Sequence, residues 1–243
     1  MSMKKYGFTL GEVLITLSVV SLVAILTIPT FLGDLAAKGR MARLTSTIGD
    51  LNNAVQLYMI KNRLNALDEN FKFNDFLETK DQLPSRYYGS EPTNGYLNGQ
   101  SGNSGFQGRH TDSIGLLQNG VFLGQGSSTN YGGEYPDLNL TNGAHQERDC
   151  YTILIDVNGE DKPNTVGLDI FEVFVYKKNF HLDGDPEKEI VIHAGDIGGY
   201  PTQKIGDTEP YSEDNLKDMC LEGNTVACYT LAEQKGFAYD YYK

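Results

Sequence analysis

The chain has 243 residues, a formal net charge of −12 at pH 7 and a sequence pI of about 4.7. A negative charge of this size repels phosphate backbones, so it argues against nucleic-acid binding, including DNA capture at a cell surface. The length accommodates one globular domain and an additional element. The mean hydropathy of −0.37 indicates a mostly soluble chain, although apolar residues are concentrated before residue 32.

The N-terminal segment starts with a short leader that contains Lys4 and Lys5, and an apolar run over residues 8–31 follows Gly7. At a rise of about 1.5 Å per residue, a helix over this run would be roughly 36 Å long, which is enough to cross a bilayer. A secretory signal peptide has a shorter apolar core that is followed by its cleavage site. Here the small residue precedes the apolar run, so a cut after Gly7 would remove the leader and keep the whole helix.

Glu12 is the one ionisable residue of the apolar run. A carboxylate near the end of a membrane helix costs on the order of 2–3 kcal/mol unless a cation pairs with it. Cleavage after Gly7 would create such a cation, the α-amine of Phe8, and in a helix bundle Glu12 of one subunit would pair with Phe8 of another. The alternative is that the Glu12 side chain reaches the membrane interface by itself.

Together these residues resemble the prepilin signal of type IV pilins and type II secretion pseudopilins. The resemblance is restricted to the N-terminal segment and rests on Pro29 and on the string Lys4-Lys5-Tyr6-Gly7-Phe8-Thr9-Leu10-Gly11-Glu12-Val13-Leu14-Ile15. It implies that a prepilin peptidase cleaves after Gly7 and methylates Phe8, and that Glu12 acts in assembly. It also implies a subunit held in the bacterial inner membrane, with its C-terminal domain outside the cytoplasm. An inner-membrane assembly platform would then move it from lipid into a pilus or pseudopilus with other subunits.

A second hypothesis is a membrane-anchored extracytoplasmic binding or enzymatic domain that uses this helix as an anchor, for which no cut after Gly7 is needed. Motifs of serine hydrolases, P-loop proteins and zinc metalloproteases are absent from the sequence. The histidines at positions 110, 145, 181 and 193 do not share metal-ligand spacing. We therefore expect a structural subunit rather than an enzyme.

Residues 32–66 are expected to continue as an amphipathic helix, because apolar residues recur at steps of four and three at Leu44, Ile48, Leu51, Val55 and Tyr58. We expect this stripe to pack on the protein's own sheet. A coiled-coil partner is less favoured, since the stripe covers about two heptads. Pro29, Gly33 and Gly39 predict an interruption or kink between the two helical segments.

Residues 67–243 are predicted to form the soluble domain. Residues 81–145 are rich in Gly, Ser, Asn and Tyr, which indicates a long loop region with one hairpin, 114–117 and 121–123, around Asn119-Gly120. β-Branched and aromatic residues predict strands at 151–157 and 170–176, and a third at 189–193. The predicted fold class is α+β, with a long N-terminal helix packed on a C-terminal antiparallel sheet, and this order also resembles that of pilins.

The loop between the first two of these strands is rich in oxygen ligands, which are Asp156, Asn158, Asp161, Asn164 and Asp169. Carboxylate and amide oxygens around a tight loop suit a hard cation such as calcium, although the spacing is not that of an EF-hand. Some secretion pseudopilins carry calcium in a loop of their sheet region. The alternative is an Asx-turn loop whose side chains cap their own backbone.

The cysteines are Cys150, Cys220 and Cys228, and no CxxC pair indicates zinc. Gly223 and Asn224 allow the chain to turn back between Cys220 and Cys228, so an exported domain would join these two as a disulfide. Cys150 would then be a small buried apolar residue at the start of a strand. Pairing of Cys150 with one of the other two remains the alternative.

Overall fold

The computed structural model describes residues 7–81, 111–126, 150–159, 161, 164–181, 187, 190–200 and 210–242. The chain divides into two compact units, Met1–Gly39 and Arg40–Lys243. We call the second of these the head unit. Most of the predicted loop region 81–145 lies outside the described residues.

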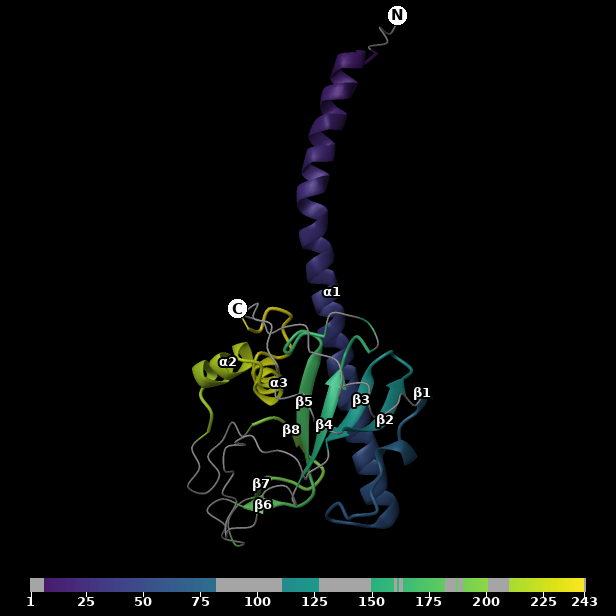
Figure 1. The fold of residues 1–243 in the computed structure, drawn as a ribbon, viewed down its shortest axis with the longest axis vertical. Coiled ribbons are helices and arrows are strands. Elements are labelled where there is room, and N and C mark those ends of the chain that lie inside the picture. The colour runs from purple at the N-terminus through teal and green to yellow at the C-terminus, as the bar shows by residue number, and fades with distance from the viewer. Residues whose placement is uncertain are drawn as a thin grey trace, which may run out of the picture. The chain divides into compact units, whose positions relative to one another are not determined.

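The first helix, α1, is continuous from Leu10 to Asn62 (Figure 1). The predicted interruption at Pro29, Gly33 and Gly39 is therefore wrong. Proline removes one backbone donor, and glycine lowers helix propensity by about 1 kcal/mol relative to alanine. These costs weaken the helix locally without ending it.

The C-terminal end of α1 has the hydrogen bonds of a Schellman motif. The Leu64 amide donates to the Met59 carbonyl over 2.9 Å, and the Arg63 amide donates to the Ile60 carbonyl over 3.2 Å. Arg63 has a φ of 55°, the left-handed conformation in which glycine is the usual residue. These two backbone hydrogen bonds cap the C-terminus of α1, a few residues before the predicted boundary at 66.

The sheet of the head unit is antiparallel and has the strand order β1-β2-β3-β4-β5-β8. Its strands are β1 (Thr79–Asp81), β2 (Thr111–Leu117), β3 (Phe122–Gly126), β4 (Cys150–Asp156), β5 (Ile170–Tyr176) and β8 (Ile197–Gly198). The predicted hairpin around Asn119-Gly120 is confirmed as β2–β3, and the predicted strand pair is confirmed as β4–β5. An α+β class with a long N-terminal helix and a C-terminal antiparallel sheet is therefore present.

The core of the head unit lies between α1 and one face of this sheet. On that face Ile153 pairs with Val173 across β4 and β5. These side chains form one buried cluster with the helix stripe predicted from the sequence: Leu44, Leu51 and Val55 are fully buried, Tyr58 is 7% exposed and Ile48 is partly buried (Figure 1). The stripe packs on the chain's own sheet, as predicted.

The third predicted strand is present but lies in a different sheet. β7 (Ile190–Ile192) pairs with β6 (Phe180–His181) in a separate two-stranded sheet, and β8 takes the place beside β5. Residues after β7 turn back because Gly195 has a φ of 87°, and the Gly195 amide donates a 2.7 Å hydrogen bond to the Tyr176 carbonyl. The edge of the main sheet therefore continues through residues 195–198.

The C-terminal region forms two helices that the sequence reasoning did not predict, α2 (Glu213–Leu221) and α3 (Thr225–Gln234). A 3₁₀ turn, η1 (Phe73–Asp75), lies after α1. Each C-terminal helix has a capping residue, since the Ser212 hydroxyl accepts from the Asn215 amide and Asn224 Oδ1 accepts from the Ala227 amide. α3 is tied to β5 by Thr225, whose hydroxyl donates to the buried carboxylate of Glu172.

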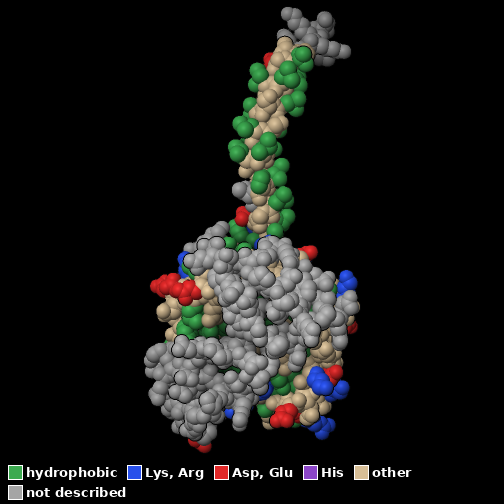
Figure 2. All heavy atoms as spheres, viewed as in Figure 1, with side chains coloured by type: hydrophobic (Ala, Val, Ile, Leu, Met, Phe, Trp, Pro, Cys, Tyr) green, Lys and Arg blue, Asp and Glu red, His purple; other side chains and the backbone are tan. Residues whose placement is uncertain are grey.

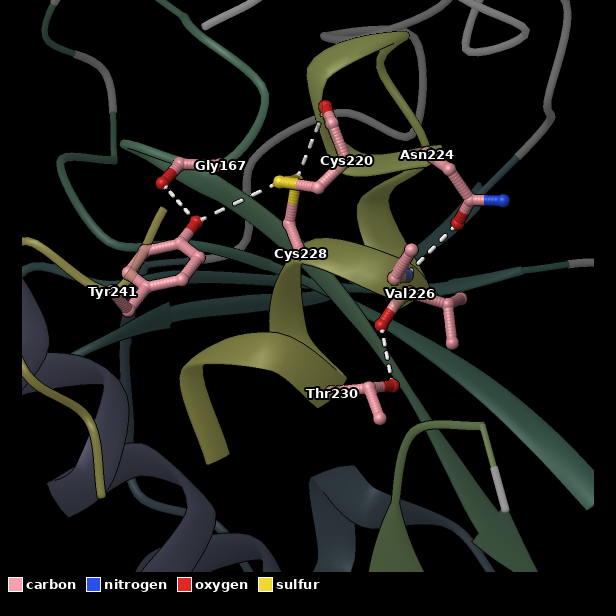
Figure 3. Close-up of a disulfide and its surroundings, with 8 residues drawn as sticks. Gly167, Cys220, Asn224, Val226, Cys228, Thr230 and Tyr241 are labelled. Atoms are coloured by element: carbon pink, nitrogen blue, oxygen red, sulfur yellow. Dashed lines mark hydrogen bonds between the residues drawn. A yellow bond between two sulfur atoms is a disulfide. The ribbon is translucent and has the colours of Figure 1, made fainter. Parts of the chain in front are cut away.

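The disulfide joins Cys220 of α2 to Cys228 of α3 (Figure 3). Both cysteines are fully buried, whereas Cys150 is outside the disulfide and half-buried at the start of β4. The predicted pairing is therefore the one in the structure. The intervening residues form a helix–turn–helix rather than a simple loop, with Gly223 at a φ of 95° in the turn.

Candidate functional site

The first turn of α1 is closed by a capping box between Thr9 and Glu12. The Thr9 amide and hydroxyl donate to Glu12 Oε2 over 2.8 and 2.9 Å, and the Glu12 amide donates to the Thr9 hydroxyl over 3.2 Å. The pattern Thr-x-x-Glu satisfies helix N-terminal donors reciprocally. Glu12 Oε1 accepts no hydrogen bond from any described residue, so one carboxylate oxygen is left for another partner.

Gly7 and Phe8 precede this capped turn. A Cβ built on Gly7 would meet no atom within 4 Å, and the Phe8 side chain is 87% exposed. The peptide bond between them thus lies in extended chain outside the helix. The leader residues before Gly7, including Lys4 and Lys5, fall outside the described residues.

The apolar half of α1 is uncovered within its unit. Large apolar side chains from Leu10 to Leu35 are exposed, and Figure 2 shows hydrophobic side chains along the visible face of this helix. In the described part of the chain, α1 is the one helix that is long and apolar enough to cross a membrane. Its length and composition are consistent with membrane anchoring near the N-terminus.

The β4–β5 loop begins with an Asx turn at Asp156. This carboxylate is fully buried, and its Oδ1 accepts hydrogen bonds from the Asn158 and Gly159 amides, each over 3.1 Å. The oxygens that were predicted to bind a cation are here used, at least in part, to cap the local backbone. Asn158 is half-buried in this turn, and Asp161 is exposed.

The loop ends at Asp169, which is 1% exposed and pairs with a cation from α1. Its Oδ1 lies 2.9 Å from Arg40 Nε, and its Oδ2 accepts from the Thr165 amide over 3.3 Å. Burial raises the pKa of Asp169 to about 6, although Arg40 and the Thr165 amide oppose that rise. The cation beside this carboxylate is therefore a guanidinium of the chain itself.

The described part of the chain contains no group of three or more His, Cys, Asp or Glu side chains that would hold a metal. Among the predicted calcium ligands, Asn164 is buried and its Oδ1 accepts no hydrogen bond from the described residues. Asp169 Oδ1 is also buried and accepts no hydrogen bond from these residues, although it lies 2.9 Å from Arg40 Nε. Buried oxygens of this kind suit a cation ligand. Calcium binding by this loop stays a prediction.

Comparisons of the chain with protein-family models, with curated proteins and with solved structures found no match. The N-terminal resemblance thus has to be judged on the residues and their geometry. The structure places Gly7, Phe8 and Glu12 together at the start of α1. The loop residues belong to the head unit, where Arg40 pairs with Asp169, a partner that the sequence did not predict.

Two further contacts attach α1 to the same end of the sheet. The Arg43 guanidinium donates to the Val157 carbonyl over 3.3 Å, and the Asn119 side chain in the β2–β3 turn donates to the Thr47 hydroxyl over 3.4 Å. Neither contact was predicted. The spacing of Arg40, Arg43 and Thr47 indicates that they share one face of α1, because residues three and four apart are neighbours on a helix. Nothing in the sequence identifies the residues that they contact.

Proposed function

We propose that this chain is a structural subunit, a minor pilin or pseudopilin, of a type IV filament machine such as a type IV pilus or a type II secretion system. The observation that carries the proposal is the arrangement at the start of α1. Gly7 and Phe8 lie in exposed chain before a capped helix turn, and Glu12 is the sole acidic residue of the apolar run over residues 8–31, whose large apolar side chains are exposed. The order of a long helix and an antiparallel sheet supports the same class.

Processing would act on the peptide bond between Gly7 and Phe8. Because Gly7 has no side chain and no neighbour that would crowd a Cβ, a prepilin peptidase would meet little steric resistance there. Hydrolysis would release the leader and turn the Phe8 nitrogen into a terminal amine, which the same enzyme would methylate. The mature chain would stay in the inner membrane through α1, with the head unit outside the cytoplasm.

Assembly would then pair Glu12 with the Phe8 amine of a neighbouring subunit. The capping box uses Oε2, so Oε1 is available to accept from that amine without opening the first turn. A charge-assisted hydrogen bond of this kind is about twice as strong as a neutral one. In an apolar helix bundle it also offsets the cost of removing the carboxylate from water.

The apolar side chains of α1 would exchange lipid for the helices of other subunits. Apolar contact with lipid tails and apolar contact with a neighbouring helix are similar, so burial alone gives weak preference for the bundle. The Glu12–amine pair would therefore supply both register and a specific attraction. The assembly platform would lift the subunit out of the membrane once this pair forms.

Two substitutions at Glu12 separate the cap from the proposed pairing. Glutamine retains a capping-box side chain but has no charge, whereas Glu12→Ala removes both. We expect both variants to be cleaved and both to be depleted from sheared filaments by at least about tenfold, the effect of losing about 1.4 kcal/mol. Thr9→Val is the matched control, because it removes the cap hydroxyl and leaves the carboxylate.

Normal assembly of Glu12→Gln together with loss of assembly in Glu12→Ala would show that Glu12 is a cap and not a pairing group. Gly7→Leu should block cleavage, since a bulky side chain would stand beside the scissile bond. The alternative is a binding or enzymatic domain that uses α1 only as a membrane anchor. In that case the head unit would keep its activity and stay in the membrane in Gly7→Leu. None of the Glu12, Thr9 or Gly7 variants would then change the amount of filament.

A further inference from the structure

The two turns at one end of the sheet pack directly on each other. A Cβ added at Gly159, in the β4–β5 loop, would lie 2.4 Å from the carbonyl oxygen of Gly120 in the β2–β3 turn. The same end of the sheet receives Arg43 and Thr47 of α1, as described above. This end of the head unit is therefore a contact point for the β2–β3 turn, the β4–β5 loop and α1.

The last part of the loop, residues 164–169, is held on its α1 side by the Arg40–Asp169 ion pair. Asp169 is almost fully buried and its backbone is fixed as well, because its carbonyl accepts from the Val157 amide over 2.8 Å and its amide donates to the Thr165 carbonyl over 2.9 Å. Breaking a buried ion pair by removing one partner is strongly destabilising. Arg40 is also the first residue of the head unit along the chain.

The opposite side of the same segment is held by the C-terminal region. The Tyr241 hydroxyl donates to the Gly167 carbonyl, and Cys220 Sγ lies 4.0 Å from that hydroxyl (Figure 3). The Tyr241 ring packs near Phe171 of β5, with ring centroids 6.5 Å apart, and Tyr241 is 5% exposed. Tyr241 is thus fixed between the disulfide and the loop.

We propose that residues 164–169 form a clamp that sets where the head unit begins to hold α1, and that the C-terminal disulfide braces this clamp through Tyr241. Asp169 grips α1 at Arg40. Tyr241 prevents the loop from moving away from α1, because its hydroxyl and ring are both seated in the core. Loosening either side releases the first two turns of the head-bound part of α1, residues 40–47, which include the first stripe residue, Leu44, while the stripe from Leu51 to Tyr58 stays packed. This inference does not depend on the proposed function.

Hydrogen–deuterium exchange of the full chain in detergent micelles tests the clamp. Arg40→Gln removes the guanidinium and leaves the buried Asp169 carboxylate without its cation, and Tyr241→Phe removes one hydroxyl. We expect each to raise amide exchange over residues 40–47 by at least about tenfold, with little change over residues 51–58, because local opening is governed by local contacts. Lys235→Gln is the control, since its ion pair with Glu213 is exposed and should not affect either segment.

Reduction of the wild-type chain tests the brace without any substitution. A phosphine cleaves the disulfide to two thiols and is itself oxidised to the phosphine oxide, and we expect exchange over residues 164–169 and 40–47 to rise together. If Arg40→Gln does not fold, Arg40→Lys is the second variant, because lysine keeps the charge but not the guanidinium geometry. Unchanged exchange over residues 40–47 in Arg40→Gln, or in Arg40→Lys, would overturn the clamp. A rise in exchange over residues 40–47 in Arg40→Gln, but not in Tyr241→Phe or on reduction, would overturn the brace.

Discussion

A methyl group on Gly159 would lie 2.4 Å from the carbonyl oxygen of Gly120, so the turns of two neighbouring hairpins pack backbone to backbone. Gly159 also has a φ of 64°, in the left-handed region. Glycine tolerates the left-handed conformation and leaves room for the Gly120 carbonyl, whereas any other residue adds a clash to a strained backbone. The contact joins the loop whose residues were predicted to bind calcium to the hairpin turn predicted at Asn119-Gly120.

Gly159→Ala is expected to lower the free energy of unfolding by about 2–5 kcal/mol. Left-handed backbone costs a non-glycine residue about 1–2 kcal/mol, and the clash adds about 1–3 kcal/mol. Urea unfolding of the full chain in detergent measures this difference. Gly49→Ala is the matched control, because Gly49 is an exposed helical glycine with open space around it, and there alanine should stabilise by about 0.5–1 kcal/mol. Equal stabilities of wild type and Gly159→Ala would contradict the contact.

The stability of the chain relative to Asp169→Asn is expected to increase as the pH falls from 7 to 4. Burial raises the pKa of Asp169 from 3.8 to about 6 in the folded state, so the folded protein binds a proton more tightly than the unfolded chain does. The favourable contribution is complete below the unfolded pKa and is lost as the pH rises through about 6. Its size is on the order of 2–3 kcal/mol. A difference between the two proteins that does not change with pH would contradict the shift.

Asp156→Ala is expected to lower the melting temperature in the presence of chelator. The substitution removes the oxygen that accepts the Asn158 and Gly159 amides, and each unsatisfied buried donor costs about 1–3 kcal/mol. Differential scanning calorimetry measures the loss, and an unchanged melting temperature in chelator would show that the cap contributes nothing.

The same scans in millimolar calcium test the cation hypothesis. A rise in wild type that disappears in Asp156→Ala would support it by mass action, and identical wild-type curves would end it.

Removal of the disulfide by the double substitution Cys220→Ala and Cys228→Ala is expected to cost about 2–3 kcal/mol. Its two cysteines are eight residues apart, and closing a loop of this length restricts the unfolded chain by roughly 2.5 kcal/mol at 25 °C in the chain-entropy model. Cys150→Ala is the control, because Cys150 is outside the disulfide and half-buried, and this substitution should lower stability less. Denaturant unfolding with and without reductant separates the bond from the packing of the side chains.

Local patterns in the sequence were sufficient for much of the fold. The stripe from Leu44 to Tyr58 has helical period and packs on the sheet, and the Asn-Gly pair at 119–120 forms the turn of a hairpin. The interruption predicted at Pro29 was wrong because a long helix tolerates one missing hydrogen bond. The helices α2 and α3 were missed, although Ser212 and Asn224 are helix-capping residues and were readable signals.

The candidate site likewise contains one contact that the sequence predicts and one that it does not. Thr9 and Glu12 have the spacing of a capping box, so this local contact was predictable from the sequence. The Arg40–Asp169 pair was not, since the two residues are far apart in the chain and no pattern links a helix cation to one particular aspartate. Tertiary structure determines such a partner, and it also decides whether loop oxygens face a metal, a guanidinium or their own backbone.

The N-terminus of the mature protein tests the central claim most directly. The full chain is expressed in a bacterium that has a prepilin peptidase, extracted from the membrane, and examined by intact mass and N-terminal sequencing. We expect a chain that begins at Phe8, carries one added methyl group on its terminal nitrogen, and is absent when Gly7→Leu is introduced. A membrane-extracted protein that still begins at Met1 or Ser2 would contradict the assignment to a filament subunit.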